Sequence, residues 1–284
     1  MKKILITGEN SYLGQALNEW LSRQPEKYSV ETIDMRDGTW QDRDFSAYDV
    51  IFHAAGIAHS SSNSKTKDLY FRVNRDLAFE TAKKAEEQAV KQFIFMSSIL
   101  VYGSETTLID KNTAPNPGNY YAQSKLQAEQ LLETLASPDF KIVILRSPMI
   151  YGKNSKGNYR KLSQLVRKIR IFPDIPNQRS MLHIDNFTEF VKLMIDNEES
   201  GLFFPQNEDY VTTSHMVSSI GRAHGKKIKL TRLFNPVLKL MKKNKTVNKL
   251  FGSLAYEKSM SLYDKGNYQI RDFDESIRLS EKSS

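Results

Sequence analysis

Short aliphatic runs alternate with longer helix-like stretches along the first half of the chain, and this alternation limits the possible folds more than any other feature. Each aliphatic run is apolar at successive positions, as expected for a strand that helices cover on both faces. We predict strands at residues 3–7, 30–34, 50–54, 93–97 and 142–147. We predict helices at residues 12–23, 68–89 and 119–136. Such alternation favours βαβ units and a parallel sheet.

The pattern changes after residue 150. A loop rich in Gly, Asn and Lys at 152–158 precedes a predicted helix near 159–170 and a proline-punctuated loop at 172–179. The 284 residues are enough for one large α/β unit or two modest domains. We therefore predict an α/β fold, a doubly wound parallel sheet of the Rossmann type in residues 1–150, with a smaller C-terminal α/β unit in residues 151–284 that can interleave with it.

Composition excludes several classes of protein. The chain has no cysteine, so disulfides, thiolate metal sites and a catalytic thiol are excluded, and we predict no metal site. The longest apolar runs, 93–96 and 142–145, are far shorter than the roughly 18 residues of a membrane span. The apolar run after Lys2 and Lys3 is also too short for a secretory signal. We therefore expect a cytoplasmic protein.

The net charge of +8 is a local property. Residues 222–249 contain ten basic and no acidic residues, and the rest of the chain carries a charge of −2. An amphipathic stretch at 236–250 lies within this segment. The segment 222–250 is interpreted either as a solvated helix face or as a weak peripheral contact with anionic lipid. Single-stranded nucleic acid is the weakest interpretation, because stacking aromatic residues are sparse there.

The segment 3–14 places a strand, a tight polar turn and a helix start in the order that a dinucleotide-binding loop requires. Gly8 permits the tight turn, and Gly14 permits close packing of the helix against the strand. Backbone N–H groups at the helix N-terminus would face a pyrophosphate. Ser11 stands where the usual pattern has its middle glycine.

Asp34 lies at the end of the next predicted strand, twenty positions after Gly14. A carboxylate at this place accepts hydrogen bonds from the adenosine ribose hydroxyls and repels a 2′-phosphate, which favours NAD over NADP. Arg36 lies close enough to tolerate that phosphate, so NADP stays open. The alternative is an ordinary surface aspartate at a strand end.

Tyr121 and Lys125 are four residues apart and therefore share one face of the predicted helix 119–136. A nearby ammonium group stabilises phenolate, so Tyr121 can exchange a proton with an alcohol near neutral pH. Ser98 ends a predicted strand, where ligands bind in open parallel sheets, and can hydrogen-bond the same alcohol oxygen. Each residue alone also has an ordinary structural explanation.

Together these motifs resemble the extended short-chain dehydrogenase/reductases, the NAD-dependent epimerase/dehydratase family of nucleotide-sugar enzymes. The resemblance covers nearly the whole chain. It rests on motifs that follow one another in order: Thr7-Gly8-x-x-Ser11-x-x-Gly14, Asp34, His53-Ala54-Ala55-Gly56, Asn74, Ser97-Ser98 to Gly103, Tyr121-x-x-x-Lys125, Leu145-Arg146 to Gly152 and Arg179 to Asn186.

The resemblance implies a role for each matching residue. It makes Ser98, Tyr121 and Lys125 catalytic, with Lys125 also holding the nicotinamide ribose. It implies that Ser98, Asn158 and Arg179 contact the substrate, with Arg179 on a diphosphate. Residues 1–150 would bind NAD and residues 151–284 mainly the substrate. The implied cofactor-binding residues are Gly8, Asn10, Ser11, Tyr12, Leu13, Gly14, Asp34, Ala54, Ala55, Gly56, Tyr121, Lys125 and Pro148.

Family enzymes share one chemistry with several outcomes. We predict a UDP-hexose 4-epimerase that acts through a 4-keto intermediate, with Tyr121 as acid and base. The alternative is an NAD(P)H-dependent UDP-4-keto-sugar 4-reductase. A non-catalytic NAD-binding sensor is disfavoured, because all three catalytic positions are intact. A dehydratase is disfavoured because Ile99 and Leu100 stand where dehydratases carry an acidic pair. The resemblance also implies a homodimer formed through residues 68–89 and 119–136. As a departure from the family, few residues lie between Asp34 and Asp49, so we predict that this edge of the sheet is shortened.

Overall fold

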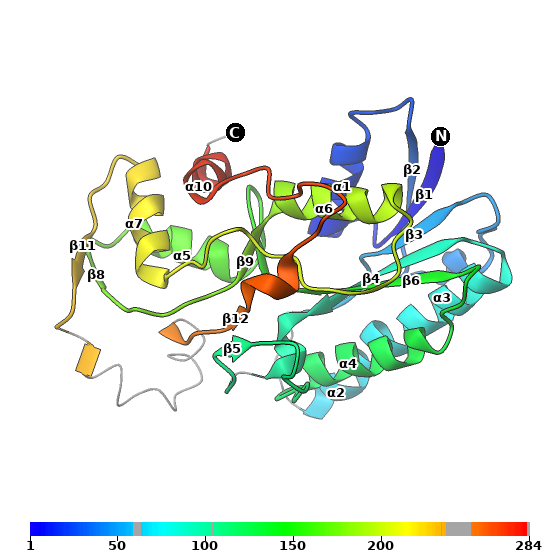
Figure 1. The fold of residues 1–284 in the computed structure, drawn as a ribbon, viewed down its shortest axis with the longest axis horizontal. Coiled ribbons are helices and arrows are strands. Elements are labelled where there is room, and N and C mark those ends of the chain that lie inside the picture. The colour runs from blue at the N-terminus through cyan, green and yellow to red at the C-terminus, as the bar shows by residue number, and fades with distance from the viewer. Residues whose placement is uncertain (59–63, 104, 234, 237–250, 283–284) are drawn as a thin grey trace.

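The computed structural model describes residues 1–58, 64–103, 105–233, 235–236 and 251–282. Its centre is a six-stranded sheet in the order β10-β6-β4-β3-β1-β2, and all of its strand pairs are parallel (Figure 1). The predicted doubly wound Rossmann-type sheet is thereby confirmed. The strands are β1 (Lys2–Thr7), β2 (Tyr28–Ile33), β3 (Val50–His53), β4 (Gln92–Ser98), β6 (Lys141–Ser147) and β10 (Gly201–Phe203).

Helices cover both faces of this sheet (Figure 1). On one face, α1 (Tyr12–Leu21) and α6 (Ile184–Asp196) form an apolar core with side chains such as Ile4. On the other face, α3 (Leu77–Glu87) and α4 (Tyr120–Glu133) pack on neighbours such as Leu5. Successive residues of a strand point to opposite faces, so both faces demand apolar side chains. This requirement explains the continuous aliphatic runs of the sequence.

The predicted helix at 68–89 is interrupted. The structure has α2 (Ser64–Phe71), a π-helical segment η2 (Arg72–Asp76) and then α3. The wider π-helical turn presents Asn74, whose amide nitrogen donates to Ser124 Oγ on α4 at 3.1 Å and to the Ile57 carbonyl at 3.0 Å. Helical periodicity predicts the presence of a helix but carries no information about such a local widening.

The predicted shortening of one edge of the sheet is confirmed. Only the short 3₁₀-helix η1 (Thr39–Gln41) lies between β2 and β3, and β2 is the edge strand. Trp40 and Phe45 from this connection are buried in the core shared with α3 and α4. The connection therefore covers apolar surface without adding a strand.

The remaining elements form a smaller lobe with its own apolar core, which includes Tyr159, Val217 and Ile277. Because α6 and β10 return to the main sheet, the chain after residue 150 contributes to both parts, and the functional division at residue 150 stays a prediction. The remaining elements are η3 (Ile99–Tyr102), β5 (Leu108–Ile109), β7 (Met149–Tyr151), α5 (Asn158–Val166), β8 (Ile171–Pro173), β9 (Met181–His183), α7 (Thr213–Ala223), β11 (Lys229–Thr231), β12 (Ala255–Tyr256), η5 (Lys258–Ser261) and α10 (Phe273–Glu281).

Membrane insertion finds no support in the described part of the chain, where no helix is long and apolar enough to span a bilayer. Residues 237–250 of the predicted basic segment 222–250 lie outside the described residues.

Candidate functional site

The turn between β1 and α1 has the geometry of a nucleotide-binding loop. Gly8 has a φ of +81°, and a Cβ atom there would lie 3.0 Å from the backbone nitrogen of Ala55. Only glycine fits this close approach. Ser11 caps α1, because its Oγ accepts a hydrogen bond from the Gly14 N–H at 3.0 Å. The serine that departs from the glycine pattern thus has a structural role, and the first N–H groups of α1 remain available for an anion.

Asp34 follows β2 directly, next to this loop, since the Gly8 N–H donates to the Ile33 carbonyl at 2.9 Å. Its carboxylate accepts hydrogen bonds from the backbone N–H of Arg36 and from the Arg36 guanidinium. These hydrogen bonds lower the pKa of Asp34 to about 2. The carboxylate is therefore charged at neutral pH, as contact with ribose hydroxyls requires, while Arg36 offers a cation two residues away.

Tyr121 and Ser98 meet at the carboxyl edge of the sheet. Ser98 ends β4 and is buried, and Tyr121 lies in the first turn of α4. Burial raises the pKa of Tyr121, while its hydrogen bond with the Ser98 side chain acts in the opposite direction. The ring of Tyr70 packs edge-on against Tyr121 at 6.1 Å. The phenol and the hydroxyl thus reach one another, which is the arrangement needed to act on a single substrate oxygen.

Lys125 is buried one turn further along α4. Its Nζ lies 4.5 Å from the ring centroid of Phe95, and a Cβ atom on Gly56 would lie 3.4 Å from it. Burial lowers the pKa of Lys125 to about 8. The ammonium group therefore lies near the carboxyl edge of the sheet, the edge at which the β1–α1 loop also lies.

The other predicted cofactor residues lie along the same edge. Asn10, Tyr12 and Leu13 belong to the loop and to the first turn of α1, while Ala54 and Ala55 follow β3. Pro148 follows β6, the neighbour of β4. The structure thus brings all predicted catalytic and cofactor residues to the carboxyl ends of adjacent parallel strands, where open α/β sheets bind ligands. Their individual roles stay predictions.

Two site-supporting groups were not among the predicted site residues. One is Asn74 in η2, which is fully buried and holds the backbone of Ile57 just beyond Gly56. The other is Glu129, whose carboxylate accepts a hydrogen bond from Ser97, the neighbour of Ser98, and forms a two-pronged ion pair with Arg146. Glu129 lies four residues after Lys125, so its place on the catalytic face of α4 was available from the spacing.

The predicted substrate residues Asn158 and Arg179 line one small cavity of about 40 Å³ in the smaller lobe. Asn158 begins α5, and the backbone of Arg179 pairs with that of Val211. Met149, Met181 and Met216 supply much of the apolar lining. A guanidinium, an amide and thioethers suit a ligand with both an anionic and an apolar part.

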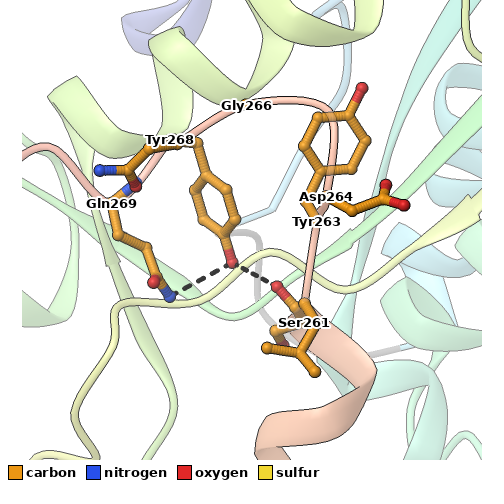
Figure 2. Close-up of a pocket in the computed structure, with 8 residues that line it drawn as sticks. Ser261, Tyr263, Asp264, Gly266, Tyr268 and Gln269 are labelled. Carbon is orange, nitrogen blue, oxygen red and sulfur yellow. Dashed lines mark hydrogen bonds between the residues drawn. The ribbon is translucent and has the colours of Figure 1, made fainter.

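A larger hollow of about 390 Å³ lies elsewhere, within the loop 261–269. Figure 2 shows that the Tyr268 hydroxyl points towards Ser261, whose carbonyl accepts its hydrogen bond at 2.9 Å. None of the predicted site residues lines this hollow, and we do not assign it to the site. Among the described residues, no cluster of His, Asp and Glu could hold a metal ion.

The nucleotide loop, the charged Asp34 and the Ser98-Tyr121-Lys125 group at one sheet edge agree with what comparison shows. Residues 4–212 match the sequence profile of the NAD dependent epimerase/dehydratase family. The chain belongs to this family. It is therefore an NAD-dependent enzyme, as predicted from the motifs. Similar solved structures include complexes with NAD and one with NADP.

Two curated family members cover most of the chain. UDP-glucose 4-epimerase of Vibrio cholerae is 29% identical over 90% of this chain and 87% of its own. N-acetyl-alpha-D-glucosaminyl-diphospho-ditrans,octacis-undecaprenol 4-epimerase of Escherichia coli O157:H7 is 27% identical over 82% of this chain and 76% of its own. A solved dTDP-4-dehydrorhamnose reductase from Clostridium acetobutylicum has a TM-score of 0.77 at 19% identity and covers 98% of each chain, which shows a shared fold.

Proposed function

We propose that the protein is a UDP-hexose 4-epimerase. The observation that carries this proposal is the convergence of Ser98, Tyr121 and Lys125 beside the β1–α1 loop. The pyrophosphate of NAD fits the tight turn at Gly8 and the N-terminus of α1, and its adenosine ribose fits the charged Asp34. When bound, NAD supplies the hydride acceptor and donor that oxidation of an alcohol requires.

The proton chemistry belongs to the chain's own residues. Tyr121 takes the proton of the sugar C4 hydroxyl as the carbon becomes a ketone, and it returns a proton when the ketone is reduced. Ser98 hydrogen-bonds the same oxygen in both directions. Lys125 stabilises the phenolate of Tyr121 electrostatically. If the 4-keto sugar rotates in the site so that its opposite face is reduced, the product has the inverted configuration at C4.

Arg179 and Asn158 are proposed to hold the diphosphate end of the substrate. An arginine can bind two phosphate oxygens at once, and its partial burial strengthens such a contact. The Vibrio cholerae relative is named for UDP-glucose, whereas the Escherichia coli relative is named for a sugar joined through diphosphate to undecaprenol. Both substrates present a sugar diphosphate, so the test must include both carriers.

The deciding experiment follows the C4 configuration of the sugar by NMR. Purified protein is incubated with UDP-glucose, UDP-N-acetylglucosamine or N-acetylglucosaminyl-diphospho-undecaprenol, without added cofactor. We expect interconversion of a UDP-sugar with its C4 epimer. Tyr121→Phe should lower the rate about 10²- to 10⁴-fold, the usual contribution of a general acid or base. The matched control is Tyr120→Phe, which changes the preceding tyrosine of α4.

Other outcomes would replace the proposal. Turnover that needs a 4-keto sugar and consumes stoichiometric NADH or NADPH would identify the alternative, a UDP-4-keto-sugar 4-reductase. Conversion of the undecaprenol-linked sugar alone would mean that the substrate is carried by undecaprenol diphosphate and not by UDP. The proposed C4 epimerisation itself would still hold. A wild-type protein that binds NAD but behaves like Tyr121→Phe towards every sugar would be a sensor.

We also propose that the enzyme is a cytoplasmic homodimer, with α4 and the α2–α3 segment at the interface. Light scattering after size exclusion tests the assembly. A monomeric mass at protein concentrations well above those of the activity assay would contradict the proposed homodimer.

A further inference from the structure

One end of the smaller lobe gathers basic residues from two separate segments. Residues 165–171 run from the end of α5 into β8, and residues 226–233 run from the end of α7 through β11. The two segments are joined directly, since β8 pairs with β11 and the Lys229 N–H donates to the Arg170 carbonyl at 2.9 Å. Figure 1 shows β8 and β11 at the end of the molecule opposite β2. We call these 15 residues the basic tip.

The basic tip contains seven basic residues and no acidic residue. Two of the seven form ion pairs with neighbours outside the tip, Arg167 with Glu281 and Arg232 with Asp174. For the other five, the described residues provide no ion-pair partner, although Lys226 donates a hydrogen bond to the Arg167 carbonyl. All seven side chains are exposed. The seven basic residues are Arg167, Lys168, Arg170, Lys226, Lys227, Lys229 and Arg232.

Exposed aliphatic side chains lie among these cations. Leu233 is 84% exposed and Ile171 is 53% exposed, and Leu165 and Leu230 are also exposed. These four belong to the nine large apolar side chains that are exposed in the described part of the chain, so the tip holds a disproportionate share. Ile171 and Lys229 are register partners on the paired strands and therefore lie side by side. A cation and an aliphatic group thus share one face of the β8–β11 pair, and the other exposed aliphatic groups lie beside it in the basic tip.

We propose that the basic tip is a docking surface for an anionic lipid bilayer. Basic side chains attract the negative charge of such a membrane, and aliphatic side chains gain by entering the interface between headgroups and acyl chains. A nucleic acid would satisfy the cations but not the exposed aliphatic groups, and binding of single strands usually relies on aromatic stacking. The aromatic residue of β8, Phe172, is buried. The surface chemistry therefore favours lipid.

The basic tip lies near the predicted substrate cavity. Asn158, at the start of α5, lines that cavity, and the tip begins at the other end of the same helix. A helix of this length spans about 13 Å. A bilayer on the tip would therefore hold the predicted substrate site close to the membrane surface, within reach of molecules anchored there by a lipid.

The test is flotation of the full-length protein with vesicles of phosphatidylcholine alone or mixed with phosphatidylglycerol. We expect binding to the anionic vesicles only, and loss of that binding at high salt. The variant K168Q/R170Q/K227Q/K229Q should reduce the bound-to-free ratio at least about tenfold. I171S/L230S/L233S should reduce it too, because the aliphatic contribution is lost while the net charge is unchanged. Both variants should keep wild-type epimerisation of soluble UDP-sugars.

The matched control is K27Q/K83Q/K91Q/K111Q, which removes the same charge from exposed lysines outside the tip. It should bind vesicles like the wild type. Equal losses in the control and the charge variant would overturn the proposal, because binding would follow net charge alone. So would absence of wild-type binding to anionic vesicles, or binding of a labelled oligonucleotide through the tip without binding of vesicles. None of these outcomes depends on the proposed epimerase activity.

Discussion

The proposed role of Lys125 predicts a pH dependence of the activity. Its ammonium group is buried beside Phe95, and burial lowers its pKa to about 8. The group is therefore charged below about pH 8 and neutral above it. If the charge stabilises the phenolate of Tyr121 as proposed, kcat/KM for a UDP-sugar should fall as the pH rises through about 8. A pH profile of kcat/KM, measured with the free enzyme as reference state, checks this expectation.

Replacement of the lysine gives the control for that profile. In Lys125→Met the cation is absent at every pH, so the residual activity should be low and should lack the decline near pH 8. The exposed Lys111 is the matched site for Lys111→Met, which should keep the wild-type profile. An unchanged alkaline limb in Lys125→Met would assign that limb to another group.

The proposed contact of Asp34 with the adenosine ribose predicts a preference for NAD over NADP. The Arg36 hydrogen bonds lower the pKa of Asp34 to about 2, so the carboxylate is negative throughout the working range. This negative charge would repel the 2′-phosphate of NADP. We expect Asp34→Ser to improve the affinity for NADPH relative to NADH about tenfold. Titration calorimetry with both nucleotides measures the ratio, and Asp37→Ser, at a nearby exposed aspartate, should leave it unchanged.

The buried ion pair between Glu129 and Arg146 connects several elements beneath the site. Glu129 is on α4 and Arg146 on β6, and Arg146 also donates to the Tyr102 hydroxyl of η3 at 2.6 Å. The Tyr256 hydroxyl of β12 donates to the Arg146 carbonyl at 2.7 Å. Helix α4, the two strands β4 and β6 and strand β12 therefore share one polar network.

Loss of one partner from this pair should be costly. Glu129→Gln leaves the Arg146 charge buried without its carboxylate, and we expect the free energy of unfolding to fall by about 3 kcal/mol. The double variant Glu129→Leu/Arg146→Met removes both charges and should lose less, because no uncompensated charge remains. Urea unfolding of the two variants measures the difference. A double variant less stable than Glu129→Gln would show that the attraction outweighs the desolvation of the charges.

The elements differ in how far the sequence could predict them. Four of the five predicted strands follow from continuous aliphatic runs, because a strand buried on both faces has no polar alternation. The edge strand β2 differs, since its residues Glu31 and Thr32 are exposed. The three residues of β10 are too few for any such run, so their return to the main sheet was not predicted. The π-helical turn at Asn74 and the contact of Glu129 with Ser97 depend on where α4 lies in space. Sequence spacing places Tyr121, Lys125 and Glu129 on one face but does not identify what they touch.

At the scale of the whole molecule, a buried histidine between two central strands predicts that acid lowers the stability of the fold. His53 ends β3 and is fully buried, and its Nδ1 lies 3.0 Å from the Thr7 hydroxyl of β1. The rings of Phe93 and Phe95 stack on it at 5.5 and 6.3 Å. Burial, and secondarily the charge of Lys125, lower the pKa of His53 to about 3. Protonation of His53 is therefore coupled to unfolding of the central sheet.

The sign of this coupling predicts how stability changes with pH. Between about pH 6.5 and about pH 3 the unfolded chain binds a proton at residue 53 that the folded chain does not, so stability falls as the pH falls. Each pH unit in this window lowers the free energy of unfolding by about 1.4 kcal/mol for His53. Burial also lowers the pKa of His183, to about 4, so His183 adds a second contribution above that pH.

Urea unfolding at about pH 7 and about pH 5 measures the combined loss of stability. His53→Gln should be less stable at neutral pH but should lose only about half as much on acidification, while His215→Gln, at an exposed histidine, should follow the wild type. An unchanged acid loss in His53→Gln would place the sensitive group elsewhere.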